Sequence, residues 1–118
     1  MTYDKNNIFA KILRNEIPCN IVDQNANALA FNDISPRAPI HILIIPKKEY
    51  QNFNEFISLA TKDEIIDFYE LINKIIKKNK LYESGYRIIA NNGSNANQEV
   101  KHLHYHLLAG KNLGLMIN

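Results

Sequence analysis

Three histidines alternate with other residues late in the sequence: His102, His104 and His106. If this segment is an extended strand, the three imidazoles lie on one face, because successive side chains of a strand point to opposite faces. Neighbouring rings would then lie roughly 6.5–7 Å apart, whereas residues two apart on a helix do not share a face. The fourth histidine, His41, lies in a second strand-like run over residues 40–45. Imidazole titrates near neutral pH, so this grouping favours chemistry.

Three explanations of the histidine row stay open from the residues alone. Structural histidines would need a hydrogen-bond partner for each buried ring. A metal could be held by two histidines two residues apart, but His102 and His106 lie roughly 13 Å apart on a strand and cannot share one ion. In nucleophilic catalysis, a neutral middle imidazole would attack phosphorus and form a covalent phosphohistidine. The neighbouring rings would transfer protons, and the Asn-, Gly- and Ser-rich loop at 91–98 would bind phosphate oxygens.

The composition is that of an ordinary globular domain. The 118 residues are 46% hydrophobic and 22% charged, with a net charge of +2, which predicts one domain over residues 1–118. This mild charge argues against a nucleic-acid partner, which usually requires a stronger and more clustered basic surface. The longest apolar run, residues 40–46, is too short to cross a bilayer, and the first residues have no apolar signal core. We therefore expect a soluble, cytoplasmic protein with no membrane partner.

The remaining pattern predicts an α+β domain that positions the histidines. Five short strands are expected, at residues 21–22, 28–31, 40–45, 86–90 and 102–108. Their mostly short connections favour a mostly antiparallel sheet. Asn7 is expected to cap a short helix over residues 8–14. Thr61 and Glu64 match a capping box at the start of one long helix, which reaches about Lys80 and covers the sheet with its apolar stripe.

These motifs resemble the histidine triad (HIT) proteins, and within them the Hint-like purine nucleoside phosphoramidases of the bacterial branch. The triad pattern followed by two apolar residues is matched by residues 102–108. Further matches follow the family's order, at residues 7–18, 30–39, 40–48 and 86–91, with 98–100 leading into the triad. The resemblance covers nearly the whole chain. It implies a HIT-like fold and a homodimer whose subunits join their sheets edge to edge, each with a pocket for a purine nucleotide.

The resemblance also implies a role for each residue of the site. His104 would attack the α-phosphorus of an adenosine 5′-phosphoramidate or an aminoacyl adenylate. The other histidines, His41, His102 and His106, would support this residue and relay protons. Asp33 would accept hydrogen bonds from the ribose hydroxyls. The remaining residues implied in nucleotide binding would wall the purine or lie around the sugar and phosphate: Ile8, Phe9, Ile12, Phe31, Asn32, Ile34, Leu43, Asn91, Asn97, Gln98, Glu99 and Val100.

Two departures from the family pattern bear on the site. Asn97 stands where the family usually has glycine, although asparagine tolerates a left-handed backbone better than most residues. Family members with structural zinc use N-terminal cysteines, whereas Cys19 is the only cysteine here, so no metal and no cofactor is expected. The main hypothesis is a metal-independent hydrolase that cleaves P–N bonds of purine nucleotides. The alternative is a nucleotide-binding module with little turnover that acts through protein partners.

Overall fold

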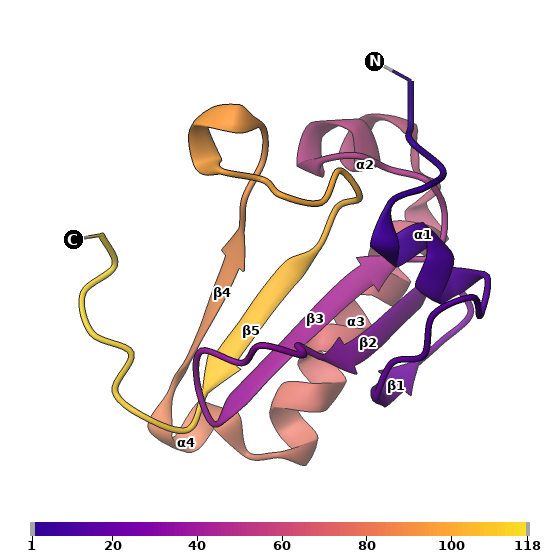
Figure 1. Cartoon of the computed structure of the whole chain (residues 1–118). Coiled ribbons are helices and arrows are strands. Elements are labelled where there is room, and N and C mark those ends of the chain that lie inside the picture. The colour runs from indigo at the N-terminus through magenta and orange to yellow at the C-terminus, as the bar shows by residue number, and fades with distance from the viewer. Residues whose placement is uncertain (1, 118) are drawn as a thin grey trace.

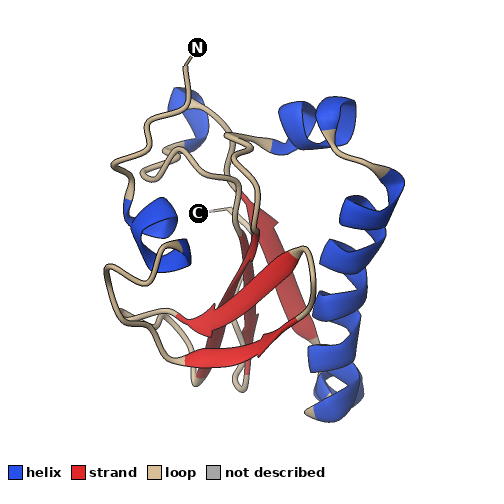
Figure 2. Cartoon of the chain, turned by 90° about the vertical axis from the view of Figure 1, so that its right-hand side faces the viewer, coloured by secondary structure: helices blue, strands red, loops and turns tan. Residues whose placement is uncertain are grey.

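A computed structural model describes residues 2–117 as one five-stranded sheet with helices on both faces (Figures 1 and 2). The strands are β1 (Ile21–Gln24), β2 (Ala28–Asn32), β3 (Ile40–Pro46), β4 (Tyr86–Ala90) and β5 (Tyr105–Ala109). The helices are α1 (Ile8–Leu13), α2 (Phe53–Leu59), α3 (Lys62–Lys78) and α4 (Leu81–Ser84). Neighbouring strands are antiparallel in the order β1-β2-β3-β5-β4, so the expected α+β fold is confirmed.

The long helix α3 packs along one face of the sheet and covers the main core (Figure 2). Phe68 and Ile75 of α3 are almost fully buried, as is Leu107 of β5. The helix begins where the capping pattern predicts, because the Glu64 N–H donates to the Thr61 hydroxyl at 3.2 Å. α3 therefore fixes the position of the central strands, with α1 on the opposite face.

The histidine strand is shorter than the sequence predicts. β5 begins at Tyr105 rather than at His102, so two of the triad histidines precede the strand. Ile44 of β3 pairs with Tyr105, and continuing that register would place Leu103 opposite Pro46. Proline has no N–H to donate to a ladder, so the pairing ends there. The Leu103 N–H donates instead to the Tyr50 carbonyl at 2.8 Å, in the segment that follows β3.

Two short helices, α2 and α4, lie outside the sequence prediction of one short and one long helix. Asn52 caps α2 with its side-chain oxygen, which accepts from the Glu55 N–H. The long helix ends at Lys78, two residues before the predicted Lys80. No helix within residues 2–117 is both long and apolar enough to cross a membrane.

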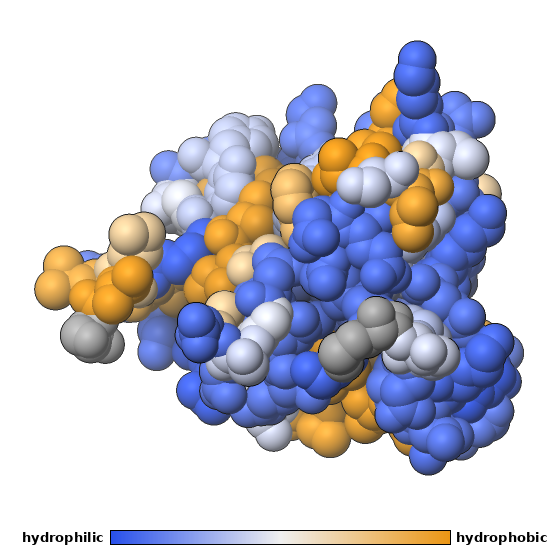
Figure 3. Space-filling view, turned by 90° about the horizontal axis from the view of Figure 1, so that it is seen from above, coloured by the Kyte–Doolittle hydropathy of each residue, from blue (hydrophilic) through white to orange (hydrophobic). Residues whose placement is uncertain are grey.

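The C-terminal tail runs past β5 and back along β4 (Figure 1). The Arg87 guanidinium donates to the carbonyl of Gly114 at 2.8 Å, which holds the base of the tail against β4. Beyond this point Leu115, Met116 and Ile117 are 79%, 82% and 80% exposed. Figure 3 shows this tail as apolar surface at the left-hand edge of the molecule. The tail thus leaves apolar side chains uncovered beside an edge strand.

Candidate functional site

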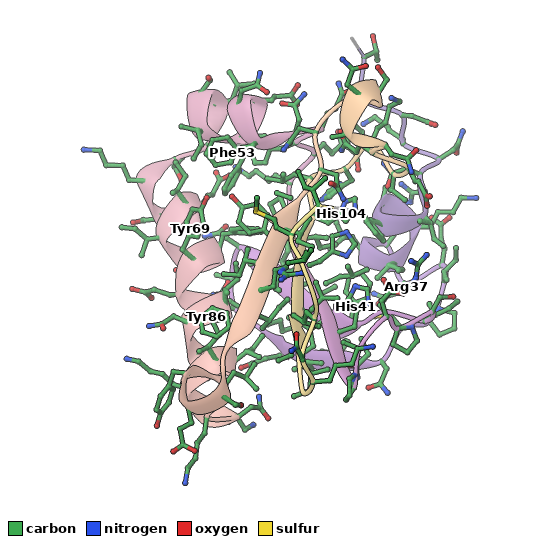
Figure 4. All side chains as sticks on the ribbon, turned by 90° about the vertical axis from the view of Figure 1, so that its left-hand side faces the viewer. Arg37, His41, Phe53, Tyr69, Tyr86 and His104 are labelled. Carbon is green, nitrogen blue, oxygen red and sulfur yellow. The ribbon has the colours of Figure 1, made fainter. Side chains whose placement is uncertain are left out.

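The histidines gather on the α1 side of the sheet, where Figure 4 shows His41 and His104. The ring centroids of His104 and His106 lie 5.1 Å apart, and those of His41 and His106 lie 5.2 Å apart. The spacing from His104 to His106 is shorter than the 6.5–7 Å expected on an extended strand, and His104 itself precedes β5. The alternate residues Leu103, Tyr105 and Leu107 belong to the core on the α3 side, as predicted.

Within residues 2–117, the hydrogen bonding of His104 engages one ring nitrogen and leaves the other without a partner. Its Nδ1 lies 2.8 Å from the carbonyl oxygen of His102, which can only accept, so Nδ1 carries the proton. Burial lowers the pKa of His104, and the ring is therefore neutral near pH 7 with a lone pair on Nε2. Phe9 of α1 packs edge-on against this ring and holds it in place. The two ring centroids lie 4.9 Å apart, and the ring planes are at 75° to each other. These are the properties of a nitrogen nucleophile.

His41 and His106 form a hydrogen-bonded pair whose tautomers follow from the backbone. The Arg37 N–H donates to Nδ1 of His41 at 3.0 Å, so the proton of neutral His41 is on Nε2. This Nε2 lies 2.9 Å from Nδ1 of His106 and 3.4 Å from a carboxylate oxygen of Asp33. His106 accepts through Nδ1 and its own proton is therefore on Nε2. Burial and the nearby His104 and His41 rings lower the pKa of His106 to about 4.

His102 is fully buried, and both of its ring nitrogens are engaged within the protein. The Tyr3 hydroxyl donates to Nδ1 at 2.6 Å, and Nε2 donates to the Pro46 carbonyl at 2.8 Å. Burial lowers the pKa of His102 to about 4, so the ring is neutral. His102 thus has the properties of a structural histidine, whereas His104 and His106 have those of reactive ones. Sequence reasoning missed Tyr3 and Pro46, since no local pattern connects them with the triad.

Asp33, His41 and His106 are the group within residues 2–117 whose ligand atoms come close enough for a metal, all within 4.8 Å of one another. Their hydrogen bonds fit a metal poorly. A metal at this point would need the lone pair of His41 Nε2, which moves the proton to Nδ1. That proton would then face the Arg37 N–H, and two donors would oppose each other. The donor set favours a shared proton over a shared ion.

The residues predicted to wall a purine come together beside the histidines. Phe9, Ile12, Phe31 and Leu43 are at most 8% exposed and form one apolar cluster between α1 and the sheet. Ile8 and Ile34, by contrast, are 43% and 90% exposed. The flat ring of a purine, placed against Ile34, would remove this apolar side chain from water. The arrangement is a buried apolar floor with two exposed apolar edges.

An open pocket of about 580 Å³ lies elsewhere. It is lined by residues at the end of α1 and along β1 and β2, including Leu29 and Lys47. Of the residues predicted to bind nucleotide it includes only Ile12, and the histidines do not line it. The chemistry of the imidazoles, and not the size of a cavity, therefore identifies the candidate site.

The loop before the triad takes the conformation that its asparagine suggested. Asn97 lies in the left-handed region at φ 56° and ψ 45°, so asparagine does take up the backbone that glycine would favour. The Gln98 amide accepts from the Gly93 N–H at 2.9 Å and donates to the Val100 carbonyl at 3.0 Å, which closes the loop. Asn91 follows β4 directly and belongs to the same loop. Its phosphate contacts stay predictions.

Three further predicted nucleotide residues lie around this arrangement. Asn32 ends β2, and its N–H donates to the Asn20 carbonyl at 3.0 Å. Glu99 is exposed, and its negative charge acts to raise the pKa of His104 against the larger effect of burial. Val100 packs against the apolar cluster beneath α1. Their contacts with a nucleotide also stay predictions.

The chain is similar to known proteins in sequence and in structure. The family model described as HIT domain matches residues 14–113. A HIT-like protein of Azospirillum brasilense is 50% identical over 116 residues, which is 98% of this chain and 95% of that protein. A purine nucleoside phosphoramidase of Escherichia coli K12 is 43% identical over 110 residues, or 93% of this chain and 92% of that protein. A histidine triad protein from Clostridium difficile has a TM-score of 0.83 at 42% identity and covers 97% of this chain and 98% of its own.

Proposed function

Because this chain belongs to the HIT domain family, we propose that it is a nucleotide-binding hydrolase that uses His104 as its nucleophile. The substrates are purine nucleoside 5′-phosphoramidates, cleaved at the P–N bond, or aminoacyl adenylates, and the product is AMP or GMP. The E. coli relative, at 43% identity, supports this choice of substrate. One observation carries the proposal: the 2.8 Å hydrogen bond from His104 Nδ1 to the His102 carbonyl, which leaves Nε2 unprotonated.

In the first step, the lone pair of His104 Nε2 attacks the α-phosphorus and the P–N bond breaks. The electron pair of that bond goes to the leaving nitrogen, which then needs a proton. In the free protein His106 is neutral, but the phosphate anion beside it raises its pKa and favours the imidazolium. The His106 Nε2–H supplies the proton, and the amine leaves while the nucleotide stays on His104. In the imidazolium Nδ1 of His106 is also protonated, so it no longer accepts from His41 as it does in the free protein. The Asp33 carboxylate, which has a ligand atom within 4.8 Å of those of both rings, balances this charge.

In the second step, water attacks the phosphorus and the P–Nε2 bond to His104 breaks. Its electron pair returns to Nε2, and the nucleophile is regenerated. The proton of the attacking water goes to His106, which is neutral after the first step and acts as the base. The result is release of AMP or GMP, with one water consumed for each substrate cleaved.

Asp33 can bind the ribose while it holds His41. One carboxylate oxygen accepts from the Ser35 N–H at 2.7 Å, and the other lies 3.4 Å from His41 Nε2. An ionised carboxylate has about four acceptor positions, so further positions stay available for the ribose hydroxyls. The Asp33 side chain can therefore contact both the ribose and the His41–His106 pair.

The proposed homodimer joins two β4 edges into one continuous sheet. β4 pairs with β5 on one side and is the last strand of the sheet on the other. An open edge strand of this kind is a template for another strand. Tyr86 and Ile88 of β4 are each 43% exposed, and Figure 4 shows Phe53, Tyr69 and Tyr86 along this side of the molecule. We expect the wild type to be a dimer by light scattering and Ile88→Lys to be a monomer.

The hydrolase proposal is tested by mixing the protein with an adenosine 5′-phosphoramidate and following AMP release. The wild type should release AMP, and rapid acid quench should trap a protein heavier by one adenylyl group, located on His104 by peptide mass spectrometry. His104→Ala should lose at least about 10³-fold in kcat, because it has no nitrogen to attack phosphorus. Lys77→Ala at the exposed end of α3 is the control and should match the wild type.

Each outcome of this test is decisive. A wild type that binds AMP but releases none from the phosphoramidate is a binding module, and the hydrolase proposal is wrong. Turnover with no adduct at any quench time, together with an active His104→Ala, would place the nucleophile elsewhere. Activity abolished by a chelator and restored by a metal would instead assign the Asp33, His41 and His106 group to an ion.

A further inference from the structure

Tyr3, far from the triad in sequence, contacts the most buried histidine of the site. Its hydroxyl lies 2.6 Å from His102 Nδ1, and the two ring centroids lie 5.7 Å apart in an edge-on arrangement at 73°. His102 Nε2 must keep its proton, because the Pro46 carbonyl at 2.8 Å can only accept. In the neutral ring Nδ1 therefore carries a lone pair, and the tyrosine O–H is the donor.

The segment that carries Tyr3 is held in place on several sides. The Asp4 carbonyl accepts from the backbone N–H of Asn7 at 3.2 Å and from its side-chain amide at 2.8 Å. The Arg14 guanidinium donates to the Lys5 carbonyl at 2.9 Å, which ties the segment to the end of α1. This network places the tyrosine hydroxyl at His102 in the folded chain.

His102 in turn orients the reactive ring of His104. The carbonyl that fixes Nδ1 of His104 belongs to His102 itself, at 2.8 Å. Phe9 packs edge-on against both rings, at 6.3 Å from His102 and 4.9 Å from His104. A shift of the His102 ring therefore moves both the carbonyl and the packing that hold the nucleophile.

We propose that Tyr3 is a positioning residue for the reaction at His104. Its hydroxyl anchors the buried His102 ring, and the His102 carbonyl then holds the His104 lone pair in line with phosphorus. Tyr3 does not touch the nucleotide and acts only through His102. The inference rests on the proposed function, and a displacement of about 1 Å at a reacting group is enough to lower a rate strongly.

The test compares Tyr3→Phe, which removes one oxygen, with the matched control Tyr82→Phe. Tyr82 is 59% exposed on α4 and lies outside the site. In single-turnover assays with an adenosine 5′-phosphoramidate, Tyr3→Phe should form the His104 adduct about three- to tenfold more slowly, the effect of losing one hydrogen bond. The KM should stay within about twofold, because the nucleotide contacts are intact. Tyr82→Phe should match the wild type in both quantities.

Ring-¹⁵N NMR gives a second readout that does not depend on activity. In the wild type, His102 should be the Nε2–H tautomer with a hydrogen-bonded Nδ1, and His104 should be the Nδ1–H tautomer. In Tyr3→Phe, the His102 Nδ1 signal should move toward the value of an unbonded ring nitrogen, and the His104 signals should shift or broaden. Tyr82→Phe should leave both rings unchanged.

The two readouts separate failure of this inference from failure of the proposed function. If the wild type has no phosphoramidase activity, the function is wrong, and the NMR spectra alone decide the role of Tyr3. Unchanged His104 signals in Tyr3→Phe overturn the inference in every case. So does an unchanged rate of adduct formation in an active protein, or an equal rate loss in Tyr82→Phe.

Discussion

The face of the sheet that packs on α3 and the face that packs on α1 differ in what their buried side chains need. On the α3 side the core cluster consists of apolar and aromatic residues, with Phe56, Phe68 and Leu107 fully buried. On the α1 side a smaller apolar cluster lies beside the histidines, whose buried ring nitrogens have specific partners. Apolar packing is non-directional, whereas a buried imidazole requires a donor or an acceptor at one position.

A single strand serves both faces. Leu107 of β5 points into the α3 core, and its neighbour His106 lies on the α1 side against His41. Alternation along the strand therefore separates the residues that stabilise the fold from those proposed to carry the chemistry. Substitutions one residue apart should therefore affect different properties of the protein.

Leu107→Ala should give the largest effect on stability. The side chain is fully buried, and its loss should lower the free energy of unfolding by about 2–5 kcal/mol, through lost burial and the cavity left behind. The kcat of the folded protein should stay within about twofold of the wild type, because no reactive group moves. Chemical denaturation and steady-state assays measure the two quantities. A tenfold loss of kcat in fully folded protein would show that the two faces of the sheet do not act independently.

The free energy of unfolding should also decrease as the pH is lowered, because His102 is buried on the α1 side of the sheet. The pKa of His102 is about 4 in the folded chain against 6.5 for the unperturbed group, owing to burial. Between these two values His102 is protonated in the unfolded chain and neutral in the folded chain. Stability is therefore lost as the pH falls from about 6.5 to about 4. For His102 alone this loss is roughly 3 kcal/mol, at 1.36 kcal/mol per pKa unit.

This pH dependence is measured by denaturant unfolding at several pH values between 7 and 4.5. Leu107→Ala should show the same slope at lower absolute stability, since it adds no titrating group. His102→Gln should show a shallower slope. Wild-type stability that stays flat down to pH 5 would contradict neutral burial of the ring.

Ile34→Ser should leave the fold intact and weaken substrate binding. The Ile34 side chain is 90% exposed, so the free energy of unfolding should change by less than about 0.5 kcal/mol. The KM for the nucleotide should rise about three- to tenfold, because the purine would lose apolar contact. Leu59→Ser, at a 69% exposed position on α2, is the control and should change neither quantity. An unchanged KM in Ile34→Ser would remove this residue from the predicted purine wall.

Asn97→Ala should give a small loss of stability that is confined to the loop and leaves the KM unchanged. The residue has φ 56°, in the left-handed region. Alanine adopts this backbone less readily than asparagine or glycine, which should cost about 1 kcal/mol. Asn97→Gly should change stability by less than about 0.5 kcal/mol in either direction, since glycine adopts this region freely. Thermal unfolding of both variants measures the difference. Equal stability of the alanine and glycine variants would show that the loop relaxes around this position.

Much of the fold follows from local patterns that are present in the sequence. The expected strand at residues 86–90 has the same bounds as β4, and the strand expected at 40–45 extends by one residue to Pro46 in β3. The Thr61 cap marks the start of α3 because its hydroxyl acts within one helical turn. The strand bounds at the triad were wrong, because the residue at which β5 starts depends on Pro46 in another strand.

The sequence by itself determined which residue types alternate, and so which side chains face the α3 core and which face α1. It also indicated the family, through the triad and the segments that match in order. Only the tertiary structure decided which tautomer each imidazole takes. Ring tautomers depend on distant groups, on the Arg37 N–H for His41 and on Tyr3 and Pro46 for His102. Hydrogen bonds between residues far apart in the chain leave no periodic signal, because they form only when packing brings the groups together.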